Sequence, residues 1–255
     1  MLPPLKLHSD VDVLKHSPLV RGMVLTLRFA EENGEIGLTK SGAMNRKFVH
    51  WAADQFDWPG YSVAELFERC KVLNELDMPP LWPVHDLLRH LKLLRQYKGV
   101  LVATKTGRAI VDTPDAFFDL VAADYLYHSI HDERLEARGG LPGSWDIFLN
   151  VINVEARTGC TLVHLLQTLY GWEEKESFDP ADSNTRFAFK FCVIRPLCWL
   201  GLLWEIGRDC RSGKMAPTTR RRSGRLRSSW RPTGRRSYDS SDATTSAARS
   251  ARRRA

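Results

Sequence analysis

The stretch LWPVHDLLRHLKLLRQYKGVLVAT, residues 81–104, decides the fold of this chain. It follows Pro79-Pro80, and its first half repeats apolar side chains at the three- and four-residue spacing of one helix face. These inward-facing residues are Val84, Leu87, Leu88, Leu91 and Leu94. The pattern then changes, because residues 93–97 and 100–104 have the short, β-prone composition of strands. Lys98-Gly99 between them is typical of a tight hairpin turn, so the stretch predicts a helix that leads into a two-stranded hairpin.

Upstream of this stretch, helical spacing surrounds one short strand. A helix is expected over residues 17–32 and a strand over 35–39, followed by helices over 43–56 and 62–73. A strand, three helices and a hairpin form the element order of a winged helix-turn-helix. In that architecture the third helix usually reads a DNA groove and the hairpin is the wing.

Downstream, the helical order repeats. Helices are expected over residues 114–137, 145–156, 160–170 and 186–203. Gly201-Leu202-Leu203 occupies the place that Lys92-Leu93-Leu94 holds before the first hairpin, so a second wing should follow. The predicted fold is therefore mainly α with small β-hairpins, in two tandem winged-helix-like units. Unit 1 spans residues 17–113 and unit 2 spans 114–214, the latter as a helical unit or incomplete winged helix, before a disordered basic tail over 215–255.

The tail carries the positive charge of the chain. Residues 211–255 hold fourteen Lys and Arg against two acidic residues, which leaves 23 basic and 28 acidic residues in 1–210. Few large apolar side chains stand beyond residue 214, so burial cannot offset chain entropy and disorder is expected. Two origins stay open: a native arm for nucleic acid or another anionic surface, or the product of a shifted reading frame. In either case the basic pI describes the tail and not the folded body.

The candidate functional residues lie on the deciding stretch. Arg89, Lys92, Arg95 and Lys98 are placed to contact DNA phosphates from the third helix and the wing. Acidic residues stand nearby, namely Asp86, Glu75 and Asp77. Three-helix units with a hairpin also serve as protein docking modules. A protein–protein interaction scaffold without DNA binding therefore remains the alternative.

No pattern for catalysis or metal binding emerges. Residues 39–42 and 104–107 share a T-K-[S/T]-G core that suits a helix cap and a sharp turn, but both lack the spacing of a phosphate-binding loop. His128 and His131 can share a helix face, yet no third ligand is identified, so surface histidines are the favoured interpretation. No G-x-S-x-G occurs, and Cys160 has no definable catalytic partner. We therefore expect no enzyme, no catalytic or metal-binding residues and no cofactor.

The location of the protein follows from what its sequence lacks. No run of eighteen uncharged apolar residues is present, and the N-terminus has no basic segment followed by an apolar one. Five cysteines without a CxxC pair suit reduced thiols. The most apolar stretch, residues 187–204, is interrupted by charges and by Pro196, and indicates a buried helix that can kink at the proline. A cytoplasmic protein without membrane contact is expected.

One region of the chain resembles a known family. The sequence LTKSGAMNRKFV, residues 38–49, together with residues 87–111, is similar to the plasmid pRi third-reading-frame-like proteins, an uncharacterised bacterial family. That family shows L-T-x-x-G-x-L/M-N-R-K-F-V, a leucine-rich helix, a basic turn and L-T-x-x-G-R-A-L; here Ala103 stands where Leu is usual. The resemblance covers roughly residues 20–115. It implies a winged-helix-like region in a bacterial protein and transfers no site residue.

Overall fold

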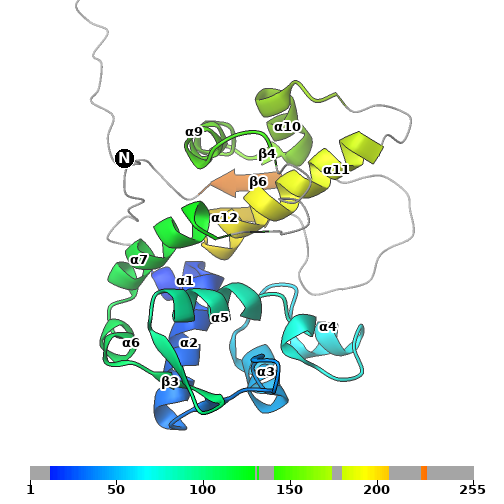
Figure 1. Cartoon of the computed structure of the whole chain (residues 1–255). Helices are drawn as coiled ribbons and strands as arrows, with labels where there is room; N and C mark the ends of the chain where they lie inside the picture. Colours follow the sequence, from blue (N-terminus) through cyan, green and yellow to red (C-terminus); the bar gives the residue numbers. More distant parts are fainter. Residues whose placement is uncertain (1–11, 130, 132–140, 174–179, 207–224, 229–255) are drawn as a thin grey trace, which may run out of the picture.

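The computed structural model describes residues 12–129, 131, 141–173, 180–206 and 225–228, and it is mainly helical with two small antiparallel sheets. The elements of the first half are α1 (Val13–His16), α2 (Pro18–Glu32), β1 (Ile36–Gly37), α3 (Arg46–Gln55), α4 (Val63–Phe67), the 3-10 helix η1 (Glu75–Asp77), α5 (Leu81–His90), β2 (Leu94–Tyr97), β3 (Val100–Ala103), α6 (Lys105–Ile110) and α7 (Pro114–Tyr127). Those of the second half are α9 (Trp145–Glu155), β4 (Cys160–Thr161), α10 (Leu162–Tyr170), α11 (Pro180–Phe189), the π-helix η2 (Lys190–Ile194), α12 (Arg195–Trp199), β5 (Leu203–Ile206) and β6 (Arg225–Ser228). Figure 1 shows the first half below and most of the second half above.

Helix α2 is the centre of the first half, and the predicted helix over residues 17–32 is confirmed. The Ser17 side chain accepts a hydrogen bond from the Val20 amide at 3.3 Å, and Pro18 occupies the first turn. Ten of the fifteen residues of α2 are buried. The helix packs against α5, α7 and β3, so burial on several sides fixes the position of the hairpin relative to α5.

The predicted hairpin is confirmed. Strands β2 and β3 pair antiparallel up to Tyr97 and Val100, and the turn residues Lys98 and Gly99 both have positive φ, 47° and 82°. Two central residues with positive φ match the right-handed twist of the flanking strands. Strand β1 pairs with β3, which gives the order β1-β3-β2. β1 is shorter than the predicted strand over 35–39, because Leu38 already bridges to Met44 in the turn that precedes α3.

The second half repeats this sheet order as β4-β6-β5. Two helix predictions need correction here. Cys160 and Thr161 form β4 and not the start of a helix, because they pair with β6. The expected helix over 186–203 is divided into α11, η2 and α12, and Leu203 already belongs to β5. Pro196 cannot donate a backbone hydrogen bond, and the wider π turn lies directly before this irregularity.

Three further expectations differ from the structure. The helix over 62–73 ends at Phe67, and the chain then turns so that Glu75 reaches Met44. The helix over 114–137 is seen as Pro114–Tyr127, and residues 132–137 lie outside the described residues. In the predicted disordered tail, Arg225–Ser228 form β6, the central strand of the second sheet. The rest of 215–255 lies outside the described residues.

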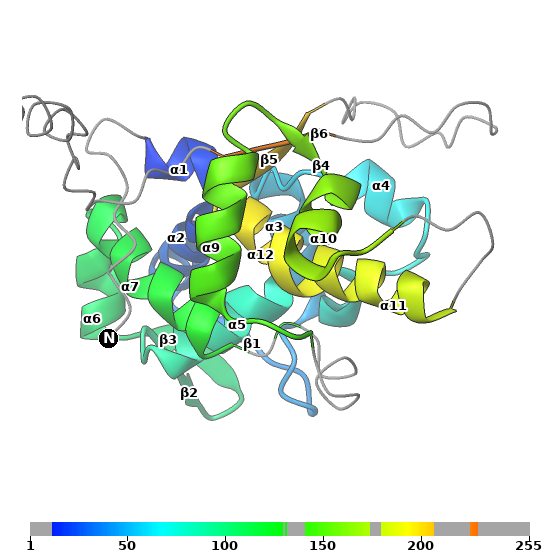
Figure 2. The same ribbon diagram turned by 90° about the horizontal axis from the view of Figure 1, so that it is seen from above.

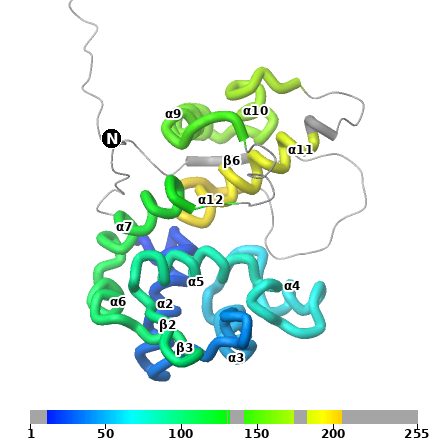
Figure 3. Tube along the Cα trace, viewed as in Figure 1, coloured from blue at the N-terminus to red at the C-terminus, as the bar shows by residue number. Residues whose placement is uncertain are grey.

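The two halves meet through aromatic and polar contacts. Seen from above in Figure 2, α9, α10 and α11 lie over the first half, and the Cα trace in Figure 3 places α7 and α12 between the two. The rings of Trp58 and Trp199 meet edge to face at 5.3 Å, and Ser17 Oγ donates to the Trp199 carbonyl at 3.4 Å. The first contact joins the loop after α3 to the end of α12, and the second joins the start of α2 to the same place. Within the described residues, no helix is long and apolar enough to span a bilayer.

Candidate functional site

The four predicted contact residues lie along ten consecutive positions and are all exposed. Arg89 is in the last turn of α5, Lys92 is at the corner between α5 and β2, Arg95 is on β2, and Lys98 is in the hairpin turn. Among the ion pairs of the described residues, none involves any of the four. Their charges are therefore available to a ligand in solution.

The outer face of the hairpin combines basic and aromatic side chains. Arg95 and Tyr97 are two residues apart on β2, so their side chains share one face of the strand. The buried Leu94 lies on the opposite face. Tyr97 is half-exposed, with the Arg95 guanidinium carbon 5.7 Å and Lys98 Nζ 5.1 Å from its ring centre. Cations over a ring face are attracted by the quadrupole of the ring. The hairpin thus presents an aromatic ring between two positive charges.

The three nearby acidic residues differ in exposure and in their hydrogen bonds. Glu75 is buried, with 7% of its surface exposed. Asp77 accepts hydrogen bonds from the backbone and side-chain amides of Asn74 at 2.8 and 2.9 Å, and these bonds lower the pKa of its carboxyl. Asp86 alone of the three is an exposed acidic residue on α5, one turn before Arg89.

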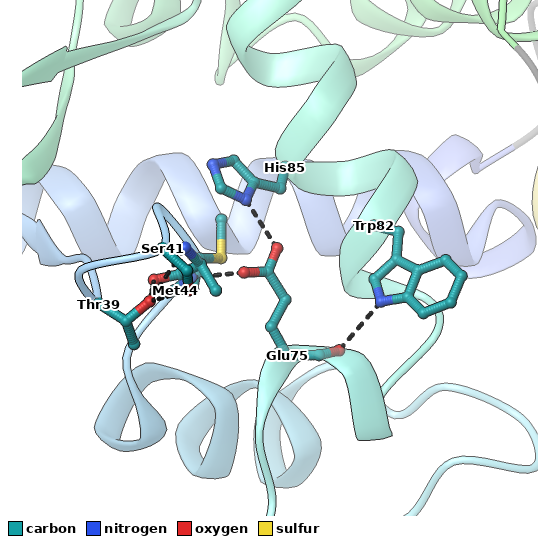
Figure 4. A network of polar contacts seen from close by, with 7 residues as sticks. Thr39, Ser41, Met44, Glu75, Trp82 and His85 are labelled. Carbon is teal, nitrogen blue, oxygen red and sulfur yellow. Dashed lines mark hydrogen bonds and ion pairs between the residues drawn. The ribbon is translucent and has the colours of Figure 1, made fainter.

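Beneath α5 lies a buried polar network that no sequence motif predicts (Figure 4). His85 Nδ1 lies 2.7 Å from Glu75 Oε1, and Glu75 Oε2 accepts a hydrogen bond from the Met44 amide. Both side chains are largely buried, with 11% of the His85 side chain and 9% of the Glu75 side chain exposed, and His85 Nε2 has no partner among the described residues. The network ties the middle of α5 to the turn that connects β1 with α3. It therefore holds the helix in place beside the hairpin.

The two T-K-[S/T]-G motifs have structural roles. Residues 39–42 form the turn between β1 and α3, and Thr104 of the second motif is the N-cap of α6. Thr39 Oγ1 accepts from the Ala43 amide at 3.1 Å, and Gly42 has a φ of 86°. Thr104 Oγ1 accepts from the Gly107 amide at 3.0 Å and donates to the Lys92 carbonyl at 2.9 Å. The second motif thus links the start of α6 to the corner between α5 and β2.

The histidine pair considered for metal binding is not brought together. His128 Nδ1 lies 3.1 Å from Asp124 Oδ1 and is exposed. His131 packs edge to face against Tyr125 and Trp145 at 4.8 and 5.6 Å, and burial lowers its pKa to about 4. The described residues contain no group of three or more side chains suited to hold a metal ion. His128 is thus an exposed residue, as the surface interpretation expects, whereas His131 is only partly exposed and packs against aromatic rings.

Fold and site together define a class: a mainly helical protein with two three-stranded antiparallel sheets, the first of which exposes a basic hairpin. Comparison with known proteins gives the family. Residues 15–116 match the family described as the Y4jL N-terminal domain, and residues 135–216 match the y4jL C-terminal domain.

The uncharacterised protein y4jL of Sinorhizobium fredii (strain NBRC 101917 / NGR234) is 56% identical over 171 residues, which cover 67% of this chain and 78% of that protein. The chain belongs to the y4jL family, a bacterial family without an assigned function. No solved structure matches it significantly. The unit boundaries expected at residues 113 and 214 and the relation to the pRi proteins stay predictions.

Proposed function

We propose that the protein is a bacterial, cytoplasmic, DNA-associated winged-helix protein, with α5 as the groove-reading helix and β2–β3 as the wing. The connectivity supports this proposal. Helix α2, strand β1, helices α3 and α5, and the hairpin follow one another, with β1 paired to β3. One departure is that α4 and η1 stand between α3 and α5, so the connection before the proposed reading helix is longer than a simple turn.

The observation that carries the proposal is the charge distribution. Arg89, Lys92, Arg95 and Lys98 are exposed and outside the ion pairs of the described residues, although residues 1–210 hold more acidic than basic residues. A local cluster of free cations on an otherwise acidic body favours phosphate at that place. The proposal is one of binding and includes no catalytic step, metal or cofactor.

A second candidate is the protein–protein interaction scaffold. It is favoured by large apolar side chains that stay exposed between α4 and the start of α5: Phe67, Val72, Leu76 and Trp82. Leu76 is 74% exposed, and Trp82 is held over η1 by a hydrogen bond from its Nε1 to the Glu75 carbonyl at 3.2 Å. Exposed apolar side chains grouped in this way are typical of binding surfaces for other proteins.

The experiment compares two full-length variants that both keep the basic tail. The first changes Arg89, Lys92, Arg95 and Lys98 to Gln. The control changes four other exposed basic residues to Gln, namely Lys47, Arg69, Lys71 and Arg157. A chain cut near residue 210 is unsuitable, because it would lose the central strand β6.

Affinity for duplex DNA is measured by fluorescence anisotropy from low to moderate salt. Each lost phosphate contact reduces the slope of log affinity against log salt by about 0.9, so the first variant should lose about 3 to 4 in slope. The control should keep the slope of the unmodified chain. Equal slopes in all three proteins would show that the tail alone binds DNA, and the scaffold would then be the better assignment.

A further inference from the structure

The corner between α12 and β5 in the second half is the counterpart of the corner between α5 and β2. The Leu93 amide donates to the Leu88 carbonyl at 2.8 Å, and the Leu202 amide donates to the Leu197 carbonyl at 2.9 Å. The residue before each of these leucines has positive φ, 57° at Lys92 and 77° at Gly201. Strands β2 and β5 start two residues later, and both are edge strands of equally ordered sheets. A constant shift of 109 residues therefore relates the two corners.

This shift gives each proposed contact residue a counterpart in the second half. Arg89 corresponds to Cys198, Lys92 to Gly201 and Arg95 to Trp204; by sequence alone, Lys98 corresponds to Gly207. All four basic residues are replaced by uncharged ones. These four positions of the second corner thus lack the basic groups that their counterparts carry.

The second corner is also partly covered by the first half, at Gly201 and Trp199. A Cβ on Gly201 would lie 2.1 Å from the His16 carbonyl oxygen, so the chain between α1 and α2 rests directly on this position. Trp199, the counterpart of His90, meets the rings of Trp58 and Tyr61 at 5.3 and 6.4 Å. The corresponding surface of the first half, around Lys92 and Arg89, is exposed.

A cavity of about 460 Å³ lies at the same junction. Its second-half wall contains Cys198, Gly201 and Trp204, and its first-half wall contains Lys15 and Asp57. Three of the four counterpart positions thus face the first half across this cavity. Cys198 and Gly201 are only partly exposed at this cavity, whereas Trp204 stays exposed.

From these contacts we propose that, apart from the basic tail, each chain offers a single nucleic-acid face, on the first half alone. The equivalent corner of the second half is instead a surface on which the first half packs. This inference rests on the proposed function and specifies its partner. One chain would contact one face of a duplex over about one helical turn. A target with two half-sites would need two chains.

The test uses a matched pair of full-length variants, Arg95→Glu and Trp204→Glu, at equivalent positions of the two edge strands. Both native side chains are exposed, Trp204 to 42%, so a Glu is accommodated at either place. Affinity is measured for a duplex of about 12 base pairs, slightly more than one helical turn. Arg95→Glu should weaken binding roughly tenfold at low salt and reduce the salt slope by about 0.9 or more. Trp204→Glu should change affinity less than about twofold, because under the inference this position makes no phosphate contact.

The outcomes separate the inference from the function on which it rests. Equal losses in both variants, each folded by circular dichroism, would mean that the second half also contacts DNA and would overturn the single-face inference alone. No loss in either variant would overturn the proposed DNA interface and the inference with it. If Trp204→Glu does not fold, Trp204→Gln replaces it, since it adds no charge. Unchanged affinity in this variant supports the inference, and a clear loss contradicts it.

Discussion

Replacing Glu75 with Leu should destabilise the protein through two hydrogen-bond donors that lose their acceptor. The Glu75 carboxylate accepts from the Met44 amide and pairs with His85 Nδ1, and it is 93% buried. Leu keeps a similar volume but accepts nothing. Each buried donor left unsatisfied costs about 1 to 3 kcal/mol, so the loss of two acceptors should lower the free energy of unfolding by about 2 to 6 kcal/mol. That loss is a large fraction of the roughly 5 to 15 kcal/mol that stabilises a typical domain.

The assay is urea unfolding followed by circular dichroism at neutral pH. The double variant Glu75→Leu/His85→Phe should recover part of the loss, because only the Met44 amide then remains without its acceptor. The control is Glu68→Leu at an exposed position after α4, which should stay within about 0.5 kcal/mol of the unmodified chain. Either of two results would refute the reasoning. One is a Glu75→Leu variant as stable as this control, and the other is a double variant whose loss of stability equals the summed losses of Glu75→Leu and His85→Phe.

Two other predictions concern stability. Gly201→Ala should cost about 2 to 4 kcal/mol, because φ is positive there and the new Cβ would collide with the His16 carbonyl oxygen. Lys92→Gly at the equivalent exposed position should change stability by less than about 1 kcal/mol. Urea unfolding of both variants checks this, and equal effects would contradict the close packing of His16 on Gly201. Burial lowers the pKa of His131 in the folded chain to about 4, below its ordinary 6.5. Between these pH values the unfolded chain binds a proton that the folded chain does not. The free energy of unfolding should therefore fall by roughly 2 to 3 kcal/mol as the pH falls through this window. Thermal unfolding between pH 7 and pH 4 measures this fall, and His131→Phe should flatten it; an equally steep profile in the variant would assign the effect to other groups.

The part of the fold predicted from sequence is the part with strong local signals. The spacing of Leu87, Leu88 and Leu91 gives α5, and Lys98-Gly99 suits only a few turn types, so the helix and hairpin follow from neighbouring residues. Strands β4 and β6 were not predicted, because a two-residue strand has no periodicity and β6 is rich in arginine. Their strand conformation comes from pairing between segments far apart in sequence, which local propensity does not report.

The candidate site was predicted in the same uneven way. The exposure of Arg89, Lys92, Arg95 and Lys98 follows from their polar positions beside an apolar face. The Glu75–His85 pair was missed, because Glu75 lies ten residues away, outside the helix that carries His85. One signal was available: Leu81, Val84, His85 and Leu88 follow the i, i+3, i+4, i+7 pattern of a buried face, which places a polar ring where it needs a partner.

Strand β6 has a consequence for the order in which the nascent chain folds. In the first sheet the central strand ends at Ala103, so all three strands have been synthesised when more than half of the chain is still to come. In the second sheet β4 and β5 are made first, and the strand that joins them comes only with Arg225–Ser228. Until those four residues leave the ribosome, two strand edges lack their partner, and unpaired edges invite pairing with other chains. A chain released before this point would have a complete first sheet and a second sheet without its central strand.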